Sequence, residues 1–307
     1  MNIIFKNLIW EIIYILTYLI FKLFNFKFKK KLVVFMYHEI SDKPSNYQKE
    51  YYLNVRTKNF IKQIRLIKKY FKIINPTDLD NKTNISDNSA IITFDDGFSG
   101  SMHNVLDILE NEKIYSIHFL NSDTVKNKLS LSAVQKFFKK NKIIYNKYLS
   151  IEENIQNISN SNKDFSDKVR DYTGNFISNS DLKIFCKKYK YFYIANHLTN
   201  HHNVLELSNK QLKQYFLENK NYFLKYKNNI NYFSYPFGQE NIHYNKKTTD
   251  YIYKNLTKMI FSANPKEYNF DKKIISRLPM FDTITYEYKF LSHIIIQNIK
   301  KNLKFYF

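Results

Sequence analysis

"IITFDDGFSG", residues 91–100, is the stretch that decides how we interpret this chain. Ile91 to Phe94 favour an extended strand, and they lead directly into two adjacent aspartates, Asp95 and Asp96, followed by a glycine. Two neighbouring carboxylates at the end of a buried strand repel each other, and burial removes their hydration. A bound cation, such as a metal ion, would offset that cost. The stretch therefore predicts a buried strand that ends at a cation site.

Short β-rich runs recur along the chain, and helical patterns follow most of them. The predicted strands are residues 32–38, 90–96, 115–120, 191–197, 231–236, 259–263 and 274–279. The predicted helices lie near residues 58–70, 101–111, 209–226, 246–256 and 286–303. Such alternation is typical of parallel strands covered by helices, and this number of strands favours a closed β/α barrel over an open sheet.

The chain divides into two predicted parts. Residues 1–30 form an N-terminal apolar helix, and residues 31–307 form the barrel. Between about residue 126 and residue 190 the pattern is helical and polar, with a loop-like middle. We interpret this segment as a helical insertion between two barrel units, because its composition gives no sign of an independent domain.

The chain is strongly basic, with a net charge of +21. It is rich in Lys, Asn, Ile, Tyr and Phe and has only four glycines, which indicates an A+T-rich coding bias as the first explanation of the charge. An anionic membrane surface is the second explanation. Nucleic acid is the last, because the sequence contains no zinc finger, ribonucleoprotein signature or basic heptad helix. One cysteine excludes an intramolecular disulfide framework and fits a reducing compartment.

Residues 3–31 are apolar and end in a basic cluster. The longest run without charge, Ile12 to Phe21, is well short of the roughly 20 residues that span a bilayer. No small-residue cleavage site follows, so we expect no removable signal peptide. On a helix, the polar and semi-polar residues of this segment form one narrow stripe. The stripe consists of Asn7, Glu11, Tyr14, Tyr18, Lys22 and Asn25.

The stripe predicts a helix in the membrane interface, with the end from Lys27 to Lys31 on anionic headgroups. A core helix packed on the barrel is the alternative. If the segment does cross the membrane, the basic flank after it would keep the body of the protein on the cytoplasmic side.

Histidines and carboxylates gather at predicted strand ends. His197 ends one strand, and His201 follows it by four residues, a spacing that brings two imidazoles together in a helical turn. With Asp96 they form a set of two histidines and one carboxylate, which leaves positions open on a hydrolytic metal. His202 is a rival ligand. His38 also ends a predicted strand.

Several motifs together resemble the polysaccharide deacetylases of the NodB-homology group, also known as carbohydrate esterase family four. "TFDDG" (93–97) is similar to the first family motif, and "NHLTNHHNVLELS" (196–208) to the metal-histidine motif. "FSYPFG" (233–238) resembles the Tyr-Pro-aromatic-Gly motif. "MYHEI" (36–40), placed before the first motif, resembles the circularly permuted branch. The resemblance covers residues 32–282 and implies a distorted (β/α)7 barrel.

The resemblance implies a role for each site residue. Asp96, His197 and His201 would bind a divalent metal, usually Zn²⁺, with His201 as the ligand in preference to His202. Asp95 would be the general base, and His38 the general acid that protonates the leaving amine.

Two further roles follow from the same resemblance. Tyr235 would help to hold the oxyanion through its backbone N–H. Arg277 would orient Asp95, although an ion pair at the barrel end is an equal alternative. The usual Gly-Ser before the first metal histidine is replaced by Ala195 and Asn196, which removes no ligand.

We therefore expect a metal-dependent hydrolase that removes N-acetyl groups from an acetamido sugar, in a surface polysaccharide or a lipid-linked glycan precursor. The alternatives are a deformylase or O-acetyl esterase on a lipid-linked sugar, and a non-catalytic glycan-binding relative. The expected partners are the glycan and a membrane surface, without nucleic acid. The expected location is the cytoplasmic face of a bacterial inner membrane, or a membrane-associated cytoplasmic position.

Overall fold

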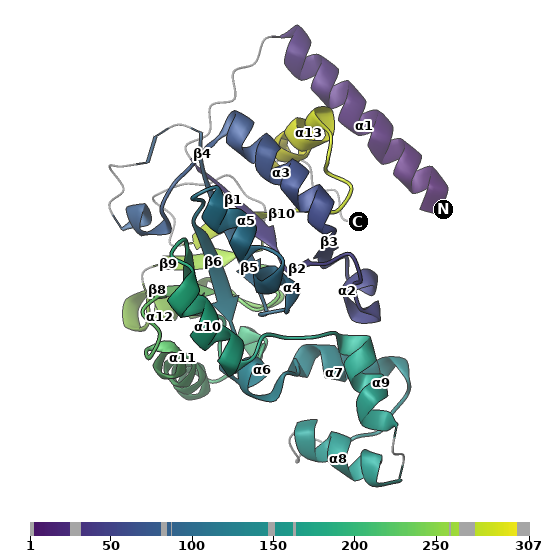
Figure 1. Ribbon diagram of the computed structural model, residues 1–307, viewed down its shortest axis with the longest axis vertical. Coiled ribbons are helices and arrows are strands. Elements are labelled where there is room, and N and C mark those ends of the chain that lie inside the picture. The colour runs from purple at the N-terminus through teal and green to yellow at the C-terminus, as the bar shows by residue number, and fades with distance from the viewer. Residues whose placement is uncertain are drawn as a thin grey trace.

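A closed parallel barrel forms the body of the protein (Figure 1). The computed structural model describes residues 3–24, 32–80, 85–86, 88–146, 151–161, 164–257, 259–263 and 274–299. The barrel strands are β1 (Leu32–Tyr37), β5 (Ser89–Asp95), β6 (Ser116–Leu120), β7 (Phe192–Asn196), β8 (Asn229–Ser234), β9 (Met259–Ser262) and β10 (Ile274–Pro279). Because β1 pairs with both β10 and β5, the sheet closes on itself. The prediction of a seven-stranded β/α barrel is confirmed.

The barrel strands are buried on both sides, which explains their continuous apolar runs. Every residue of β1 and β5 is buried. Along β1, Leu32 and Val34 pack in one cluster with Phe119, whereas Val33 and Phe35 pack in another beneath the covering helices. This alternation is the period of two that a strand imposes on its side chains.

Helices alternate with the strands and cover the barrel. They are α3 (Thr57–Tyr70), α4 (Gly100–His103), α5 (Leu106–Asn111), α11 (Asn209–Phe223), α12 (Lys246–Asn255) and α13 (Glu287–Ile299). Smaller elements are β2 (Glu39–Ile40), β3 (Asn54–Val55), β4 (Lys72–Ile73), α2 (Asn46–Glu50), η1 (Pro76–Leu79) and η3 (Val204–Glu206). The strand β4 pairs with the start of β5 outside the closed ring. The helix predicted to extend to residue 226 ends earlier, at Phe223, and residues 300–303 of the last predicted helix lie outside the described residues.

The single helix predicted over residues 101–111 is wrong, because two short helices, α4 and α5, occupy this segment. The first of them is fixed against β2. Asn104 Nδ2 donates to the Ile40 carbonyl at 2.8 Å, and the Gly100 N–H donates to Glu39 Oε2 at 3.1 Å. A Cβ on Gly100 would lie 2.3 Å from the Ile40 oxygen. Only glycine permits this close approach.

The described residues between β6 and β7 form five helices. They are α6 (Ser122–Asn127), α7 (Leu131–Lys140), α8 (Ile151–Ser161), α9 (Phe165–Thr173) and α10 (Asn179–Lys188). Leu182 and Phe185 of α10 share a cluster with Leu120 of the barrel. In contrast, α7, α8 and α9 project from the barrel (Figure 1) and pack around a second core, in which Phe138 and Val169 meet Tyr47 of α2 and Phe98 of the turn after β5.

The N-terminal helix α1 (Ile3–Leu23) lies on the outside of the molecule, across α13 (Figure 1). Tyr14, Tyr18 and Phe21 of α1 pack against the core cluster that contains Phe290 of α13. No helix among the described residues combines the length and the apolarity needed to cross a membrane. The predicted basic end of this segment, Lys27 to Lys31, lies outside the described residues.

Candidate active site

The proposed site residues gather at one end of the barrel. Since its strands are all parallel, their carboxyl ends meet there. The strand β5 delivers Asp95 and Asp96, and β7 is followed directly by His197. His38 follows β1, whose last pair with β5 is Tyr37 opposite Phe94, so His38 lies beside the start of the Asp-Asp pair.

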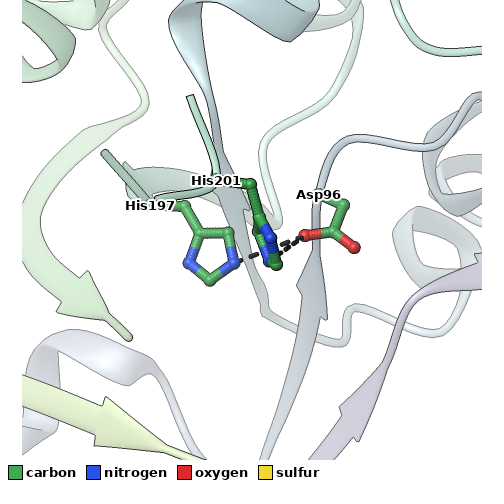
Figure 2. Close-up of side chains that lie close together, drawn as sticks. All are labelled: Asp96, His197 and His201. Carbon is green, nitrogen blue, oxygen red and sulfur yellow. Dashed lines mark ion pairs between the residues drawn. The ribbon is translucent and has the colours of Figure 1, made fainter. Parts of the chain in front are cut away.

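Three buried side chains converge at this end of the barrel (Figure 2). Each of Asp96, His197 and His201 offers one ligand atom, and these atoms lie within 4.8 Å of one another. Asp96 Oδ1 is 3.4 Å from His197 Nε2 and 3.1 Å from His201 Nε2. All three residues are at most 9% exposed. One carboxylate and two imidazoles are a donor set typical of catalytic zinc sites.

The ring of His197 is oriented by contacts outside the cluster. His197 Nδ1 lies 2.9 Å from the Ser234 carbonyl, which can only accept, so Nδ1 carries a proton and Nε2 is the atom turned toward Asp96 Oδ1. Asn121 Nδ2 donates to the His197 carbonyl at 2.5 Å. Partners of this kind fix the tautomer and direction of metal-binding histidines.

Two of these atoms have no hydrogen bond from the described residues. They are Asp96 Oδ1 and His197 Nε2, and both are buried. Although burial alone would raise the pKa of Asp96, the neighbouring His201 and His197 hold it well below its usual range. A buried carboxylate oxygen and a buried imidazole nitrogen that face each other and lack other hydrogen-bond partners fit a cation. The residues present therefore fit a divalent metal.

The turn after β5 is strained, and its neighbours hold it in place. Asp96 and Gly97 both have positive φ values, +69° and +74°. A non-glycine residue at positive φ costs free energy and is often found at functional sites. The turn is tied down because Ile177 N–H donates to the Gly97 carbonyl at 3.0 Å and Ser99 N–H to the Asn175 carbonyl at 2.9 Å. The end of the inserted segment thus supports the turn that presents Asp96.

Asp95 has a different environment from Asp96. Its two oxygens accept from Arg277 Nη1 at 2.6 Å and Nη2 at 2.7 Å, a bidentate pair. Arg277 is 1% exposed and also donates to Ser234 Oγ at 2.6 Å and to the Ser262 carbonyl at 3.3 Å. Burial would raise the pKa of Asp95, but the Arg277 guanidinium holds it below the usual range. Asp95 is therefore a carboxylate near neutral pH, outside the three-ligand cluster.

His38 is half-buried at the same end of the barrel. Burial lowers the pKa of His38, while the charges of Asp96 and Asp95 act in the opposite direction. Both aspartates therefore lie close enough to His38 for their charges to favour its protonated form. The balance between burial and these charges decides how far His38 can hold a proton near neutral pH.

The expected role of the Tyr235 N–H is wrong. This N–H donates to the Phe261 carbonyl at 3.0 Å between β8 and β9, so it has no capacity left for an oxyanion. The Tyr235 ring stacks on Tyr244 in the core. Two residues later, the N–H of Phe237 makes no hydrogen bond within the described residues. Phe237 has φ +61°, and its ring centroid lies 4.3 Å from that of His201.

The structure also separates the two rival histidines. His201 belongs to the three-ligand cluster, whereas His202 stacks on Tyr215 with ring centroids 4.7 Å apart. Sequence reasoning missed Phe237 and Ser234, which both lie in the quoted "FSYPFG" motif. The signal was present in the tight Pro-aromatic-Gly turn, where a backbone N–H commonly lacks a sheet partner.

Comparisons with known proteins agree with this geometry. The family model described as "Polysaccharide deacetylase" matches residues 82–257, more than half of the chain. Among curated proteins, none matches.

Three solved structures illustrate the likeness in fold. The first is IcaB from Ammonifex degensii, with a TM-score of 0.61, 13% identity and coverage of 86% of this chain and 97% of that one. The second is the polysaccharide deacetylase BC0361 from Bacillus cereus, with a TM-score of 0.58, 17% identity and coverage of 88% of this chain and 70% of that one. The third is the Streptococcus pyogenes deacetylase PplD in complex with acetate, with a TM-score of 0.57, 15% identity and coverage of 88% of this chain and 98% of that one. Identities this low show the fold alone, and the family model carries the assignment. The chain belongs to the polysaccharide deacetylase family.

Proposed function

We propose that this protein removes acetyl groups from the nitrogen of an acetamido sugar, with a divalent metal held by Asp96, His197 and His201. One observation carries the proposal. The two adjacent aspartates have different partners: Asp95 is paired with Arg277, and Asp96 faces the two histidines. Amide hydrolysis of this kind needs both a cation site and a carboxylate base that is not a metal ligand, and this division supplies one of each.

The donor set favours zinc among the divalent metals, because imidazole nitrogen suits it and two histidines with a carboxylate form a common catalytic set. When bound, the metal supplies a Lewis acid that lowers the pKa of a coordinated water from 15.7 toward about 7. The chain contributes the orientation of the ligands. Ser234 and Asn121 hold His197 so that its Nε2 faces Asp96 Oδ1.

Proton transfer falls to Asp95 and His38. Asp95 accepts a proton from the attacking water, since Arg277 keeps it a carboxylate. The water oxygen bonds to the acetyl carbon, and the carbon–nitrogen bond then breaks. An amine is a poor leaving group until it is protonated, and His38 donates that proton. The products are acetate and the free amino sugar.

The negative charge that develops on the acetyl oxygen needs a hydrogen-bond donor. We assign this donor to the backbone N–H of Phe237 in place of Tyr235. The N–H makes no hydrogen bond within the described residues, and the Phe237 ring contacts His201. Phe237 and Gly238 both have positive φ, and the Gly238 N–H donates to the Pro236 carbonyl at 2.7 Å, which fixes the turn that carries the Phe237 N–H.

The proposed substrate is a surface polysaccharide or a lipid-linked glycan precursor at the cytoplasmic face of a bacterial inner membrane. This part of the proposal rests on the apolar helix α1 and on the net charge of +21. An apolar helix beside a basic body suits an enzyme that works at an anionic membrane surface. Removal of a formyl group or an O-acetyl ester remains the alternative chemistry at the same site.

The proposal is tested by incubating the zinc-loaded protein with oligomers of N-acetylglucosamine. We expect acetate and free amine to appear in equal amounts, and the Asp95→Asn variant to release both at least about a hundredfold more slowly. Formate in place of acetate from a formylated substrate would show a deformylase, and acetate without amine from an O-acetylated substrate would show an esterase. A protein that purifies without metal and binds the oligomers unchanged would contradict the proposal and favour a glycan-binding relative.

A further inference from the structure

The outward side of α1 is almost purely aliphatic. We call it the outer face, and it consists of Leu8, Ile12, Ile15, Leu16, Leu19, Ile20 and Leu23. These side chains are between 43% and 80% exposed. Their spacing of three and four residues places them on one side of the helix. Isolated exposed leucines are ordinary, but a continuous row of this length on a helix indicates a surface that binds a partner.

The inward side of α1 carries the polar groups, and these groups contact α13. Glu11 Oε2 pairs with Lys289 Nζ at 2.7 Å, and Glu11 Oε1 accepts from the Tyr288 hydroxyl. Ser292 Oγ donates to the Tyr14 carbonyl at 2.7 Å. Glu11, Tyr14 and Tyr18 of the polar stripe foreseen in the sequence thus face protein, and the outer face is left exposed. This orientation is the reverse of a helix that packs on a core in water.

The helix α13 connects α1 rigidly to the barrel. Phe290 of α13 is fully buried, and its ring stacks on Phe35 of β1 with centroids 5.8 Å apart. The aromatic rings of Tyr18 and Tyr288 also meet, with centroids 6.4 Å apart. Because α1 is tied to a helix that is itself part of the core, it is a fixed surface of the body and its outer face has a fixed direction.

The chemistry of the outer face favours lipid over a second copy of the chain. Protein interfaces are enriched in aromatic residues, Met and Arg at their centres, whereas the centre of the outer face has none of these and only Phe24, 70% exposed, follows its last residue. Two copies that each carry a charge of +21 repel, whereas the same charge attracts anionic headgroups. Lys22 is exposed beside the outer face, and the sequence after α1 continues with further lysines.

We infer that the outer face of α1 is a docking surface for an anionic lipid membrane, on which the helix lies in the plane of the surface. A crossing helix would have to carry Glu11 into the bilayer and break its contacts with Lys289 and Tyr288. A helix that lies flat keeps these contacts and buries only its outer face, to a depth of roughly 5–10 Å. The inference rests on the membrane part of the proposed function and is independent of the hydrolysis.

Vesicle flotation of the full chain tests the docking surface. We expect the wild type to float with vesicles of 70% phosphatidylcholine and 30% phosphatidylglycerol, and more weakly with phosphatidylcholine alone. The double variant Leu16→Glu/Leu19→Glu should bind the anionic vesicles at least tenfold more weakly. Ile184→Glu and Leu224→Glu are matched controls, since each residue is 58% exposed and lies on another element. Both controls should bind like the wild type.

The orientation of α1 has its own test, because Trp10 is the only tryptophan of the chain. In a Trp10→Phe background, a single tryptophan is placed at residue 8, 16 or 23, and its fluorescence is quenched by lipids brominated at shallow or deep positions. A helix lying in the surface gives similar shallow depths at all three positions. A markedly deeper value at residue 16 alone would show a crossing helix and overturn the inferred orientation.

Asp96→Asn separates this inference from the proposed function. The variant should bind vesicles as the wild type does, whatever its activity. Three results would overturn the docking surface: no flotation of the wild type, equal weakening in the Ile184→Glu control, or a dimer in light scattering that Leu16→Glu dissociates. The last result would assign the outer face to a second copy of the chain.

Discussion

Two regions of this molecule, the catalytic end of the barrel and the helix α1, both depart from the usual arrangement of a protein in water, in opposite ways. At the catalytic end of the barrel, the charged Asp95, Asp96 and Arg277 are buried. On α1, large aliphatic side chains are exposed while Glu11 and Tyr14 face inward. Neither arrangement lowers the free energy of an isolated chain in water. Each one becomes favourable when a partner is added.

The two regions differ in which of their groups still lack a contact when no metal or membrane is bound. Asp95 has a bidentate arginine and needs no ion, whereas Asp96 Oδ1 lacks a hydrogen bond from the described residues. On α1 the polar contacts are already made, and only apolar area remains uncovered. We therefore expect a cation at Asp96 and a lipid surface on the outer face of α1.

The largest effect is expected at the metal ligands. Asp96→Asn removes the only carboxylate of the cluster, so we expect zinc content near zero and kcat lower by about a thousandfold or more. Asp95→Asn removes a base that is not a ligand. This variant should keep its zinc and still lose roughly 10²–10⁴ in kcat. Elemental analysis and acetate release measure the two quantities, and equal zinc content in both variants would contradict the division of roles.

A smaller effect is expected from the buried pair beside the cluster. Arg277→Met leaves the Asp95 carboxylate buried without its partner, which costs about 3–5 kcal/mol in the free energy of unfolding. Without the guanidinium, burial dominates and the pKa of Asp95 rises above its ordinary value of 3.8. The acid limb of kcat/KM should therefore move to higher pH. Urea unfolding and a pH–rate profile measure both changes.

The matched control for this pair is the double variant Arg277→Met/Asp95→Asn. It removes the unpaired charge, so it should recover part of the lost stability. A double variant as unstable as Arg277→Met alone would show that packing of the arginine, and not its charge, stabilises this end of the barrel.

Much of the fold followed from local patterns in the sequence. The seven barrel strands are apolar runs bounded by polar residues, and their alternation with helices predicts a closed parallel sheet. The break between α4 and α5 did not follow, because it depends on Asn104 and Gly100 contacting β2, which is about sixty residues away in the chain. Contacts of that kind have no local signature.

The sequence predicted the side chains that gather at the site, but it did not predict which backbone N–H is free to bind the oxyanion. The cluster of Asp96, His197 and His201 forms as the spacing and the family motif suggest. The Tyr235 N–H donates to the Phe261 carbonyl, because the hydrogen bonding between β8 and β9 continues one residue beyond Ser234, and the motif gives no sign of this. For α1, periodicity identified the residues that share a face but not what that face contacts.

A buried histidine of the barrel should make the stability of the protein depend on pH. His118 is fully buried in β6, stacked on Phe94, and burial lowers its pKa to about 3. The unfolded chain takes up a proton near pH 6.5 that the folded chain does not, so stability falls as the pH drops below 6.5. From pH 7.5 to 5.5 this histidine should remove about 1.4 kcal/mol. The variant His118→Phe should lack this part of the pH dependence in urea unfolding of the metal-free protein, and an unchanged dependence would contradict the assignment.

The smallest change in stability is expected from the ion pair between Glu11 of α1 and Lys289 of α13, which is partly exposed. In Lys289→Met, Glu11 loses a partner at 2.7 Å but keeps the Tyr288 hydroxyl. The two side chains of the ion pair are 16% and 35% exposed, so water screens the pair and the loss should stay below about 1 kcal/mol. Lys254→Met, at an exposed lysine on α12, is the control and should change nothing.

Acid pH sharpens this last prediction. Hydrogen bonds from Lys289 and Tyr288 lower the pKa of Glu11 below its ordinary value of 4.5, so the stability that the ion pair adds is present near pH 7 and disappears as Glu11 takes up a proton. Wild type and Lys289→Met should therefore differ in urea unfolding at pH 7 and converge as the pH falls below 4.5 and through the lowered pKa of Glu11. A loss as large as that of Arg277→Met would mean that α1 and α13 enclose a true core. The outer face of α1 would then be held far more rigidly than a half-exposed ion pair can explain.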